Sequence, residues 1–231
     1  MNKQFINSAL RLSLLGIAML IMPASPAAQQ TDAAQTKNRV ELEALGRQLE
    51  AGDVVYIRIP FRPFTDVSDT TQSWTNHVGI VIDTSGKEPM IAESRFPLSG
   101  KTTWSRFVSR SEAGRVAVTR LGEPLDPEQR SRLLTAANAR SGVLYDTGFD
   151  LHSHRQFCSR YVREVLEESV GIKIGKVENF STLLAKNPQV DLGFWKKWYF
   201  GYIPWQRETV TPASLLLDSQ MDKVFDGYAR K

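Results

Sequence analysis

The sequence predicts a mixed α+β fold, and three observations support this prediction. Short runs of β-branched and aromatic residues, each bounded by turn residues, are concentrated in the first half of the chain. Longer segments with a helical spacing of apolar residues lie mainly after residue 125. Hydrophobic residues make up 42% and charged residues 23% of the 231, as in ordinary globular proteins. Strands grouped ahead of helices are typical of an α+β domain.

Turn and cap residues mark the boundaries of the expected elements. Asp126 followed by Pro127 is typical of a helix start, and Gly171 of a helix end. Asn179 or Ser181 is expected to cap a short late helix. The expected helices cover 39–50, 127–140, 158–171 and 178–186, and the expected strands cover 52–60, 76–83, 90–96 and 114–121. Loops are expected over 61–76 and 143–156, and the aromatic remainder of the chain is expected to be irregular.

The first residues follow the order of regions in a secretory signal peptide. Lys3 and Arg11 precede an eleven-residue apolar run, LSLLGIAMLIM, and the small residues Ser25 and Ala27 then mark a cleavage site after Ala27. A helix needs about 20 apolar residues to span a bilayer, so an uncleaved membrane anchor is the less favoured alternative. We therefore expect an exported protein, either periplasmic or secreted.

Domain organisation, charge and cysteine content narrow the classes of function. Cleavage of the signal peptide over 1–27 leaves a lead-in over 28–37, expected to be disordered, and a single domain over 38–231. The net charge of +4 then falls to +2, because 27 basic residues remain against 25 acidic ones. So small a charge is not the signature of a nucleic-acid-binding protein. One cysteine excludes an internal disulfide and a cysteine-rich zinc site, and we expect neither metal nor cofactor.

The lone cysteine, Cys158, is expected at the start of the helix over 158–171. The N–H groups and the dipole of a helix N-terminus stabilise a thiolate, which is the nucleophilic form of cysteine. The same N–H groups can bind a carbonyl oxygen. The alternative is a small buried apolar residue, which is a common role for a free cysteine. Its place at a helix start gives Cys158 a physical reason to be a nucleophile.

A nucleophilic thiol needs a base, and the chain has three histidines. His152 and His154 lie in the predicted loop before Cys158 and are expected to be solvated; with Cys158 they lack a fourth metal ligand. His77 begins a predicted strand, on the face opposite the core residues. Gly79 on the same face leaves room for a neighbouring segment to approach. The alternative for His77 is a half-buried histidine satisfied by its neighbours.

A third group is needed to orient the imidazole of His77. If the segments 77–83 and 89–95 form an antiparallel hairpin, the start of the first lies across from the end of the second. That register places Glu93 near His77. The alternative is a solvent-facing glutamate on a strand. The resulting hypothesis has Cys158 as nucleophile, His77 as base and Glu93 as the orienting acid.

A histidine on one strand, a glutamate on the next and a cysteine at a distant helix start resemble the order in permuted papain-like amidases. Within that family the chain is similar to the YebB-like branch (YiiX/YebB type, NlpC/P60 superfamily). The similarity extends over nearly all of the chain after the predicted signal peptide. The segments that carry it are TQSWTNHVGIVI (71–82), AESRFPLS (92–99), TTWSRFVSRS (102–111), LYDTGF (144–149), RQFCSRYV (155–162) and FWKKWYFGYIPWQRETVTPASLL (194–216).

The resemblance implies a circularly permuted papain-like (NlpC/P60) fold, with a small antiparallel sheet or barrel and packed helices. It also implies that the three residues of the hypothesis act as a Cys–His–Glu triad. Tyr145 matches a tyrosine that helps to bind the reacting carbonyl oxygen, although Tyr56 offers an alternative, and Ser159 beside the cysteine is a further candidate. Some exported relatives are lipoproteins, whereas this chain has no cysteine near its predicted cleavage site.

The expected function is that of an exported cysteine amidase or peptidase. It would hydrolyse an amide bond in a cell-wall peptide through a thioester acyl-enzyme. Peptidoglycan as the substrate follows from the predicted export and from the family alone. A lipid acyltransferase or thioesterase with the same triad is one alternative, and a non-catalytic ligand-binding protein is another. The sequence contains neither G-x-S-x-G nor S-x-x-K, which excludes the usual serine hydrolases.

A block near the C-terminus, FWKKWYFGYIPW (194–205), surrounds two lysines with aromatic residues. Aromatic side chains often line substrate clefts, and Trp195, Trp198 and Trp205, together with Trp74, are candidates for that role. Tryptophan beside lysine is also typical of a contact with a membrane surface. The third interpretation is an arm packed over the sheet. The sequence does not indicate an oligomeric state.

Overall fold

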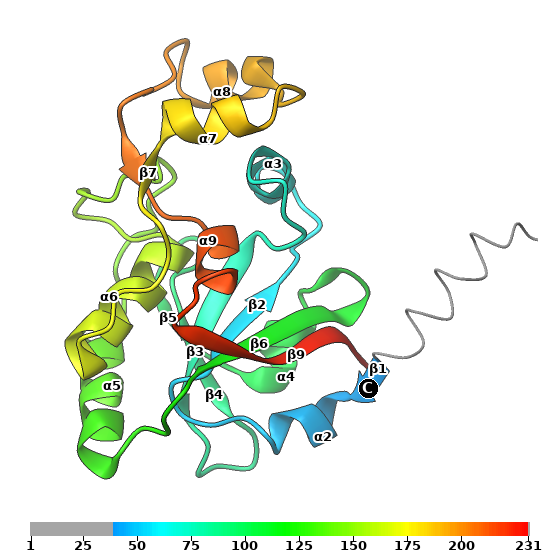
Figure 1. Cartoon of the computed structure of the whole chain (residues 1–231), viewed down its shortest axis with the longest axis vertical. Coiled ribbons are helices and arrows are strands. Elements are labelled where there is room, and N and C mark those ends of the chain that lie inside the picture. The colour runs from blue at the N-terminus through cyan, green and yellow to red at the C-terminus, as the bar shows by residue number, and fades with distance from the viewer. Residues whose placement is uncertain (1–38, 231) are drawn as a thin grey trace, which may run out of the picture.

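The computed structural model describes residues 39–230, so the predicted signal peptide (1–27) and lead-in (28–37) lie outside the described residues. Its centre is a seven-stranded sheet in the order β1-β9-β6-β2-β3-β4-β5 (Figure 1). The strands of this sheet are β1 (Arg39–Glu41), β2 (Val54–Ile57), β3 (His77–Asp83), β4 (Met90–Glu93), β5 (Gly100–Thr103), β6 (Arg115–Leu121) and β9 (Met221–Arg230). A second sheet pairs β7 (Glu178–Asn179) with β8 (Glu208–Thr209).

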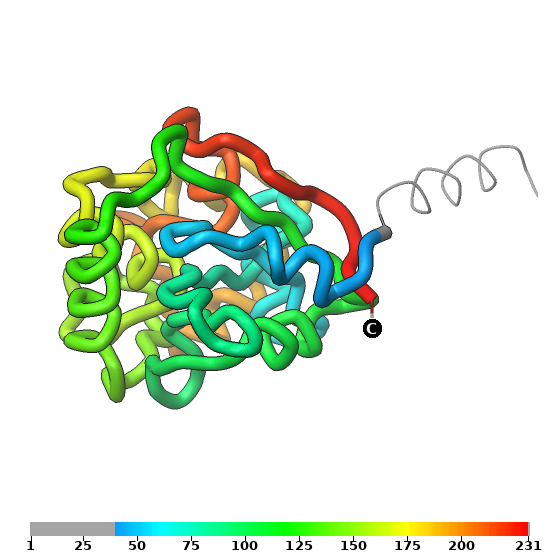
Figure 2. Tube along the Cα trace, turned by 90° about the horizontal axis from the view of Figure 1, so that it is seen from below, coloured from blue at the N-terminus to red at the C-terminus, as the bar shows by residue number. Residues whose placement is uncertain are grey.

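The large sheet is open and mostly antiparallel. Of the two alternatives in the prediction, sheet or barrel, the described residues form the sheet, with β1 and β5 as its edges. Only β1 and β9 run parallel to each other. Figure 2, seen from below, shows these first and last strands meeting at one side of the molecule. The α+β class expected from the sequence is thus confirmed.

Helices cover both faces of the sheet. The helices are α2 (Leu42–Gly46), α3 (Phe64–Thr70), α4 (Trp104–Val108), α5 (Pro127–Ala139), α6 (Cys158–Val170), α7 (Phe180–Lys186), α8 (Leu192–Trp198) and α9 (Pro212–Leu216), with a 3-10 turn at Glu112–Gly114. Alternate residues of β2 and β3, such as Tyr56 and Ile80, pack against α5 and α6. The residues between them, such as Val55 and Val81, pack against α2 and α4. The period of two along each strand therefore divides the core into two layers.

Several local predictions are confirmed. Asp126 and Gln129 form a capping box at the start of α5, with Pro127 at its first position. Gly171 ends α6 with φ of 75°, a left-handed conformation that glycine adopts without strain. Asn179 caps α7 by accepting a hydrogen bond from the Thr182 N–H. In each case the residues that make the contact are only a few positions apart in the sequence.

Several elements differ from the prediction. The helix expected over 39–50 is only α2, because residues 39–41 form β1 on the C-terminal strand instead. The loop expected over 61–76 contains α3, and β5 and α4 follow β4 where no element was expected. The C-terminal strand β9 lies in the segment expected to be irregular. Each of these elements is held by pairing or packing with distant parts of the chain.

A small third cluster lies apart from the two sheet layers. Phe180, Leu184, Trp195 and Ile203 are buried together where α7 and α8 meet. Figure 1 shows this unit at one end of the molecule, beyond the sheet and next to α3. The Trp195 indole N–H donates to the Thr70 hydroxyl at 3.0 Å and so joins α8 to α3. Among residues 39–230, no helix combines the length and apolar character that crossing a bilayer requires.

Candidate active site

The structure brings His77 and Glu93 into direct contact. Strands β3 and β4 pair with Ile80 opposite Ala92, so His77 and Glu93 lie on one face and diagonally across the pair. The His77 Nε2 is 2.5 Å from a Glu93 carboxylate oxygen. Both side chains are buried, with exposed fractions of 1% and 0%. The antiparallel register expected from the sequence thus produces this contact.

Cys158 is close enough to His77 to act on the ionisation of its imidazole. The ring nitrogen that does not contact Glu93, Nδ1, has no hydrogen-bond partner within residues 39–230. Burial lowers the pKa of His77, but hydrogen bonding and charge from Cys158 and Glu93 outweigh burial and raise it to about 9. Negative groups on both sides therefore favour the protonated imidazole. The imidazole of His77 thus interacts with the thiol of Cys158 and with the carboxylate of Glu93.

The ionisation of Glu93 determines which nitrogen of His77 carries the proton. Burial raises the pKa of Glu93, but the hydrogen bond and charge of His77, together with Arg110, outweigh burial and lower it. The carboxylate is therefore ionised and can only accept hydrogen bonds. It accepts from Nε2–H of His77, which leaves Nδ1 to take up the thiol proton.

Arg110 is the part of this arrangement for which the sequence indicates no role. It follows α4, and its Nη2 donates to both Glu93 oxygens at 2.8 and 2.9 Å. Its guanidinium lies 5.1 Å from the centre of the Phe107 ring, which in turn packs beside His77 at 5.8 Å. The segment TTWSRFVSRS contains both residues, but no periodicity in it indicates that Arg110 turns toward Glu93.

Cys158 lies at the first position of α6, as expected. Phe157 precedes the helix in an extended conformation, and no side chain caps the first turn. The N–H groups of that turn are therefore not occupied by a capping oxygen and are available to a carbonyl oxygen near the thiol. The thiol is 4% exposed, so a substrate reaches it only through the pocket that it lines.

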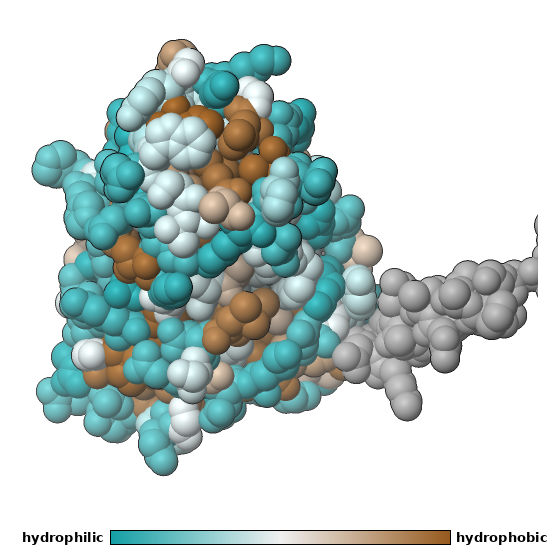
Figure 3. All heavy atoms as spheres, turned by 45° about the horizontal axis from the view of Figure 1, so that its top comes forward, coloured by the Kyte–Doolittle hydropathy of each residue, from teal (hydrophilic) through white to brown (hydrophobic). Residues whose placement is uncertain are grey.

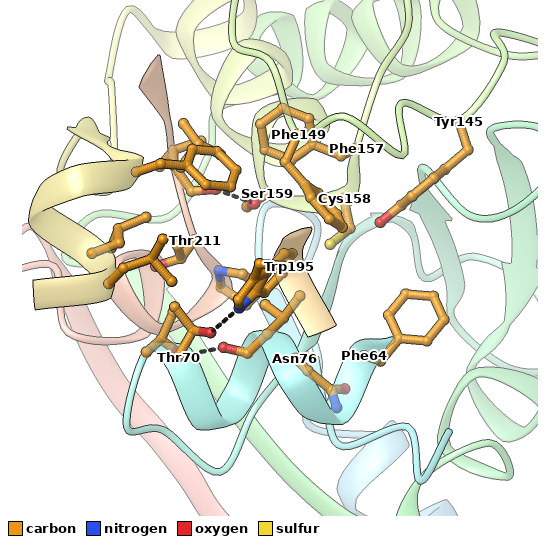
Figure 4. A pocket seen from close by; sticks show the side chains of 18 residues that line it. Phe64, Thr70, Asn76, Tyr145, Phe149, Phe157, Cys158, Ser159, Trp195 and Thr211 are labelled. Atoms are coloured by element: carbon orange, nitrogen blue, oxygen red, sulfur yellow. Dashed lines mark hydrogen bonds between the residues drawn. The ribbon is translucent and has the colours of Figure 1, made fainter. Parts of the chain in front are cut away.

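The three candidates for binding the carbonyl oxygen occupy different places. The Tyr145 hydroxyl points toward the Cys158 sulfur (Figure 4). Burial, followed by the charge and hydrogen bonding of Cys158, raises the pKa of Tyr145, so its O–H stays protonated and can donate. The Ser159 hydroxyl donates instead to the Val210 carbonyl at 2.7 Å. Tyr56 is in the core, where its hydroxyl is 3.2 Å from that of Thr119. Only the Tyr145 side chain is placed to contact a carbonyl at the thiol.

Comparison with known proteins identifies the family of the chain. Residues 48–225 match the model of a family described as permuted papain-like amidase enzymes, YaeF/YiiX, C92 family. The chain belongs to that family. The uncharacterized protein YiiX of Escherichia coli (strain K12) is 24% identical over 185 residues, which cover 80% of this chain and 90% of YiiX. The YebB-like branch within the family stays a prediction.

A solved structure, together with the family match, confirms the permuted papain-like fold that the sequence predicts. The crystal structure of YiiX from Escherichia coli O157:H7 superposes on this chain with a TM-score of 0.72 at 24% sequence identity. The superposition covers 78% of this chain and 99% of the YiiX chain. That protein is described as a metalloprotein. Within residues 39–230 of the present chain, no three His, Cys, Asp or Glu side chains are grouped to hold a metal ion. His152 is exposed and pairs with Glu208 at 2.8 Å.

In this member of the permuted papain-like amidase family, Cys158 lines a small apolar pocket (Figure 4). Its volume is about 40 Å³, and α3, α7, α8 and the segments 145–149 and 209–212 form its walls. The apolar side chains in the lining are Phe64, Val67, Tyr145, Phe149, Phe157, Phe180, Leu183, Leu184, Trp195, Val210 and Pro212. Most polar side chains of the lining have protein partners: Thr70 with Asp66 and Trp195, Thr71 with Val67, Asn76 with Ile59, Ser159 with Val210 and Thr211 with Ser214.

The four tryptophans proposed to line the cleft lie in different parts of the structure. Trp195 lines the pocket of Cys158. Trp198 faces a separate surface hollow, and its indole N–H donates to the Thr147 carbonyl at 2.9 Å. Trp205 packs in the α7–α8 cluster. Trp74 lies under the Arg115 guanidinium, 3.9 Å from its ring centre, and does not line the pocket. The aromatic block is thus mainly a packed arm that contributes one wall of the pocket.

Proposed function

We propose that this family member hydrolyses the amide or ester bond that joins an apolar acyl group to an amine or alcohol, with Cys158 as nucleophile, His77 as base and Glu93 as orienting acid. The observation that carries the proposal is the place of the Cys158 thiol in an almost wholly apolar pocket. The scissile carbonyl would lie at the thiol, and the acyl carbons next to it would enter the pocket. Burial of each such methylene contributes about 0.8 kcal/mol.

The lining favours an acyl group over the cell-wall peptide that the sequence predicted. A peptide would bring amide and charged groups against Phe149, Leu183 and Val210, and burying a polar group without a hydrogen bond costs free energy. The hydroxyl of Thr70 and the amide of Asn76 are already hydrogen-bonded and offer little to such groups. The pocket has a volume of about 40 Å³, which suits a short acyl chain. A longer chain would require α7 and α8 to move away from α3.

The mechanism follows from the positions of the donors and acceptors. The thiol proton resides on His77 Nδ1, so the sulfur attacks the carbonyl carbon as a thiolate, and Glu93 stabilises the imidazolium. Tyr145 O–H and the first N–H groups of α6 bind the oxyanion. The oxyanion collapses, His77 protonates the leaving amine or alcohol, and a thioester on Cys158 remains. Water then attacks the thioester, its proton goes to His77, and the acid leaves as the thiol re-forms.

We further propose that the protein acts after export, in the periplasm or outside the cell. The order of charged, apolar and small residues in 1–27 supports export. Expression of the full chain, followed by fractionation and mass spectrometry of its N-terminus, tests this part. A mature N-terminus at Ala28 in the periplasmic or secreted fraction supports the proposal, whereas an intact N-terminus in the cytoplasm overturns it.

Acyl-chain dependence tests the substrate class. The purified protein is assayed on p-nitrophenyl acetate and butyrate and on the matched p-nitroanilides, with muropeptides in parallel. Two buried methylenes predict a kcat/KM about tenfold higher for butyryl than for acetyl substrates. Leu183→Asn should remove that preference, while Leu217→Asn, an exposed control, should keep it. Cleavage of muropeptides without cleavage of any acyl substrate would overturn the acyl proposal in favour of the peptide.

Alkylation tests the triad without a substrate. The thiolate, and not the thiol, reacts with iodoacetamide. We expect Cys158 to react faster at pH 7 in the wild type than in His77→Ala, because His77 stabilises the thiolate. Cys158→Ala and His77→Ala should abolish turnover, and Glu93→Gln should only weaken it. A fully active Cys158→Ala protein, or a thiol indifferent to His77, would refute the triad.

A further inference from the structure

The turn after α8 exposes aromatic side chains beside two lysines. Phe200 is 100% exposed and Tyr202 71% exposed, and Lys196 and Lys197 in the last turn of α8 are also exposed. We call these four residues the α8 tip. Figure 3, in which this end of the molecule comes forward, shows brown and pale side chains gathered there among hydrophilic ones. An exposed patch of apolar side chains with polar residues around it is typical of a surface that contacts a partner or a membrane.

The fold itself gives no reason for a phenylalanine at position 200. Its φ is 53°, in the left-handed region that glycine or asparagine adopts at lower cost than a bulky residue. The N–H groups of Phe200 and Gly201 donate to the carbonyls of Lys197 and Lys196 at 3.2 and 2.7 Å, so the backbone of the turn is fixed. The side chain is fully exposed, so no packing within residues 39–230 offsets this strain. Strain without a packing benefit is typical of functional positions.

The charge around the α8 tip is positive. Lys196 and Lys197 have no carboxylate partner among residues 39–230. Lys197, Phe200 and Tyr202 border a surface hollow whose rim also carries the exposed Arg155. The acids of that hollow are already engaged: Asp146 accepts from the N–H groups of residues 148 and 150, and Asp150 lies 3.5 Å from Arg207.

We propose that the α8 tip docks on an anionic lipid bilayer. Aromatic rings insert at the level of the headgroups, and lysines on long flexible stems reach the negative phosphates. Each cation near an anionic membrane strengthens binding by about fivefold. A second copy of the chain is a poor alternative occupant, because a twofold contact through the tip would bring the unpaired lysines of both copies together.

The position of α8 connects this surface with the pocket. Trp195 of α8 lines the pocket of Cys158, and Phe200 follows α8 by two residues. A bilayer at the tip would therefore lie beside the helix that covers the pocket. The docking proposal goes beyond the proposed chemistry and can be tested without it, because binding to vesicles requires no turnover.

Vesicle flotation of the full chain, recovered through its own export route, tests docking. Vesicles of equal parts phosphatidylglycerol and phosphatidylethanolamine are compared with vesicles of phosphatidylcholine. Phe200→Ser/Tyr202→Ser and Lys196→Glu/Lys197→Glu should each reduce binding to the anionic vesicles more than tenfold. Lys87→Glu/Lys101→Glu and Leu217→Ser, which change exposed residues outside the tip, should bind as the wild type does. All variants share one N-terminus, so differences between them report on the tip.

A local measurement and a stability measurement complete the test. Anionic vesicles should slow amide exchange in residues 196–204, and the lysine double variant should abolish that protection. Phe200→Gly should keep or raise the Tm, because it relieves the left-handed strain, and still lower vesicle binding. Unchanged exchange over 196–204 with anionic vesicles, equal binding to phosphatidylcholine, or a dimer that the tip variants dissociate would each overturn the proposal.

Discussion

A single nitrogen of Arg110 lies within 2.9 Å of both carboxylate oxygens of Glu93, and Glu93 in turn holds His77. The carboxylate thus has a cation on each side when His77 is protonated. Its burial would otherwise favour the neutral acid. Arg110 is not among the residues that line the pocket of Cys158, so we regard it as a positioning residue that acts through Glu93.

Replacement of Arg110 tests this relationship. Burial raises the pKa of Glu93, and the charges of His77 and Arg110 lower it, so Arg110→Gln should raise it again. We expect kcat/KM to fall by about tenfold and the acid limb of its pH profile to move to higher pH. Arg110→Lys, which keeps the charge, should keep most of the profile. A loss of activity with no change in the profile would indicate a purely structural role.

Stability should depend on pH through His77. Burial lowers the pKa of His77, and Cys158 and Glu93 raise it to about 9, above the value of about 6.5 in an unfolded chain. A raised pKa adds stability that is fully present below pH 6.5 and is lost as the pH rises to about 9. The contribution is about 3 kcal/mol. Urea unfolding at pH 6 and pH 9.5 should show that loss in the wild type, whereas a flat difference between wild type and His77→Gln would contradict it.

Much of the site follows from local sequence patterns, and the structure shows why. The register of one hairpin sets His77 against Glu93, and the start of one helix presents Cys158. Both features depend on residues close together in the chain. Strand alternation and the Gly171 cap are equally local, which is why β3 and α6 agree with their predicted ranges to within about a residue.

The elements that the sequence did not predict depend on distant contacts. Helix α3 follows a proline in a polar segment. Two hydrogen bonds hold it: the Trp195 indole N–H donates to the Thr70 hydroxyl, and the Asn187 amide donates to the Asp69 carbonyl. Strand β9 pairs with β6, about a hundred residues earlier. Arg110 reaches Glu93 only because the short helix α4 packs against the sheet through Phe107. Such placements depend on the assembled core rather than on local propensity.

Gly79 leaves the space that Phe107 needs beside His77. A Cβ at this position would lie 2.7 Å from the Ile91 Cγ2, 3.0 Å from the Phe107 ring and 3.1 Å from the Ala92 carbonyl oxygen. Gly79→Ala should therefore lower the free energy of unfolding by about 1–3 kcal/mol and reduce kcat/KM by displacing Phe107. Gly100→Ala is the control, because its Cβ would meet nothing within 4 Å. Equal Tm values for the two variants would contradict this account.

Tyr145 and Tyr56 form a matched pair for testing the oxyanion site. Both are buried, but the Tyr145 hydroxyl points to the Cys158 sulfur and the Tyr56 hydroxyl to Thr119. Loss of one oxyanion donor costs about 10²–10³ in kcat, so Tyr145→Phe should lower kcat about a hundredfold with KM nearly constant. Tyr56→Phe should lower stability by about 1 kcal/mol through its lost hydrogen bond and leave kcat unchanged. If Tyr145→Phe keeps the kcat of the wild type, the N–H groups at the start of α6 bind the oxyanion without help from Tyr145.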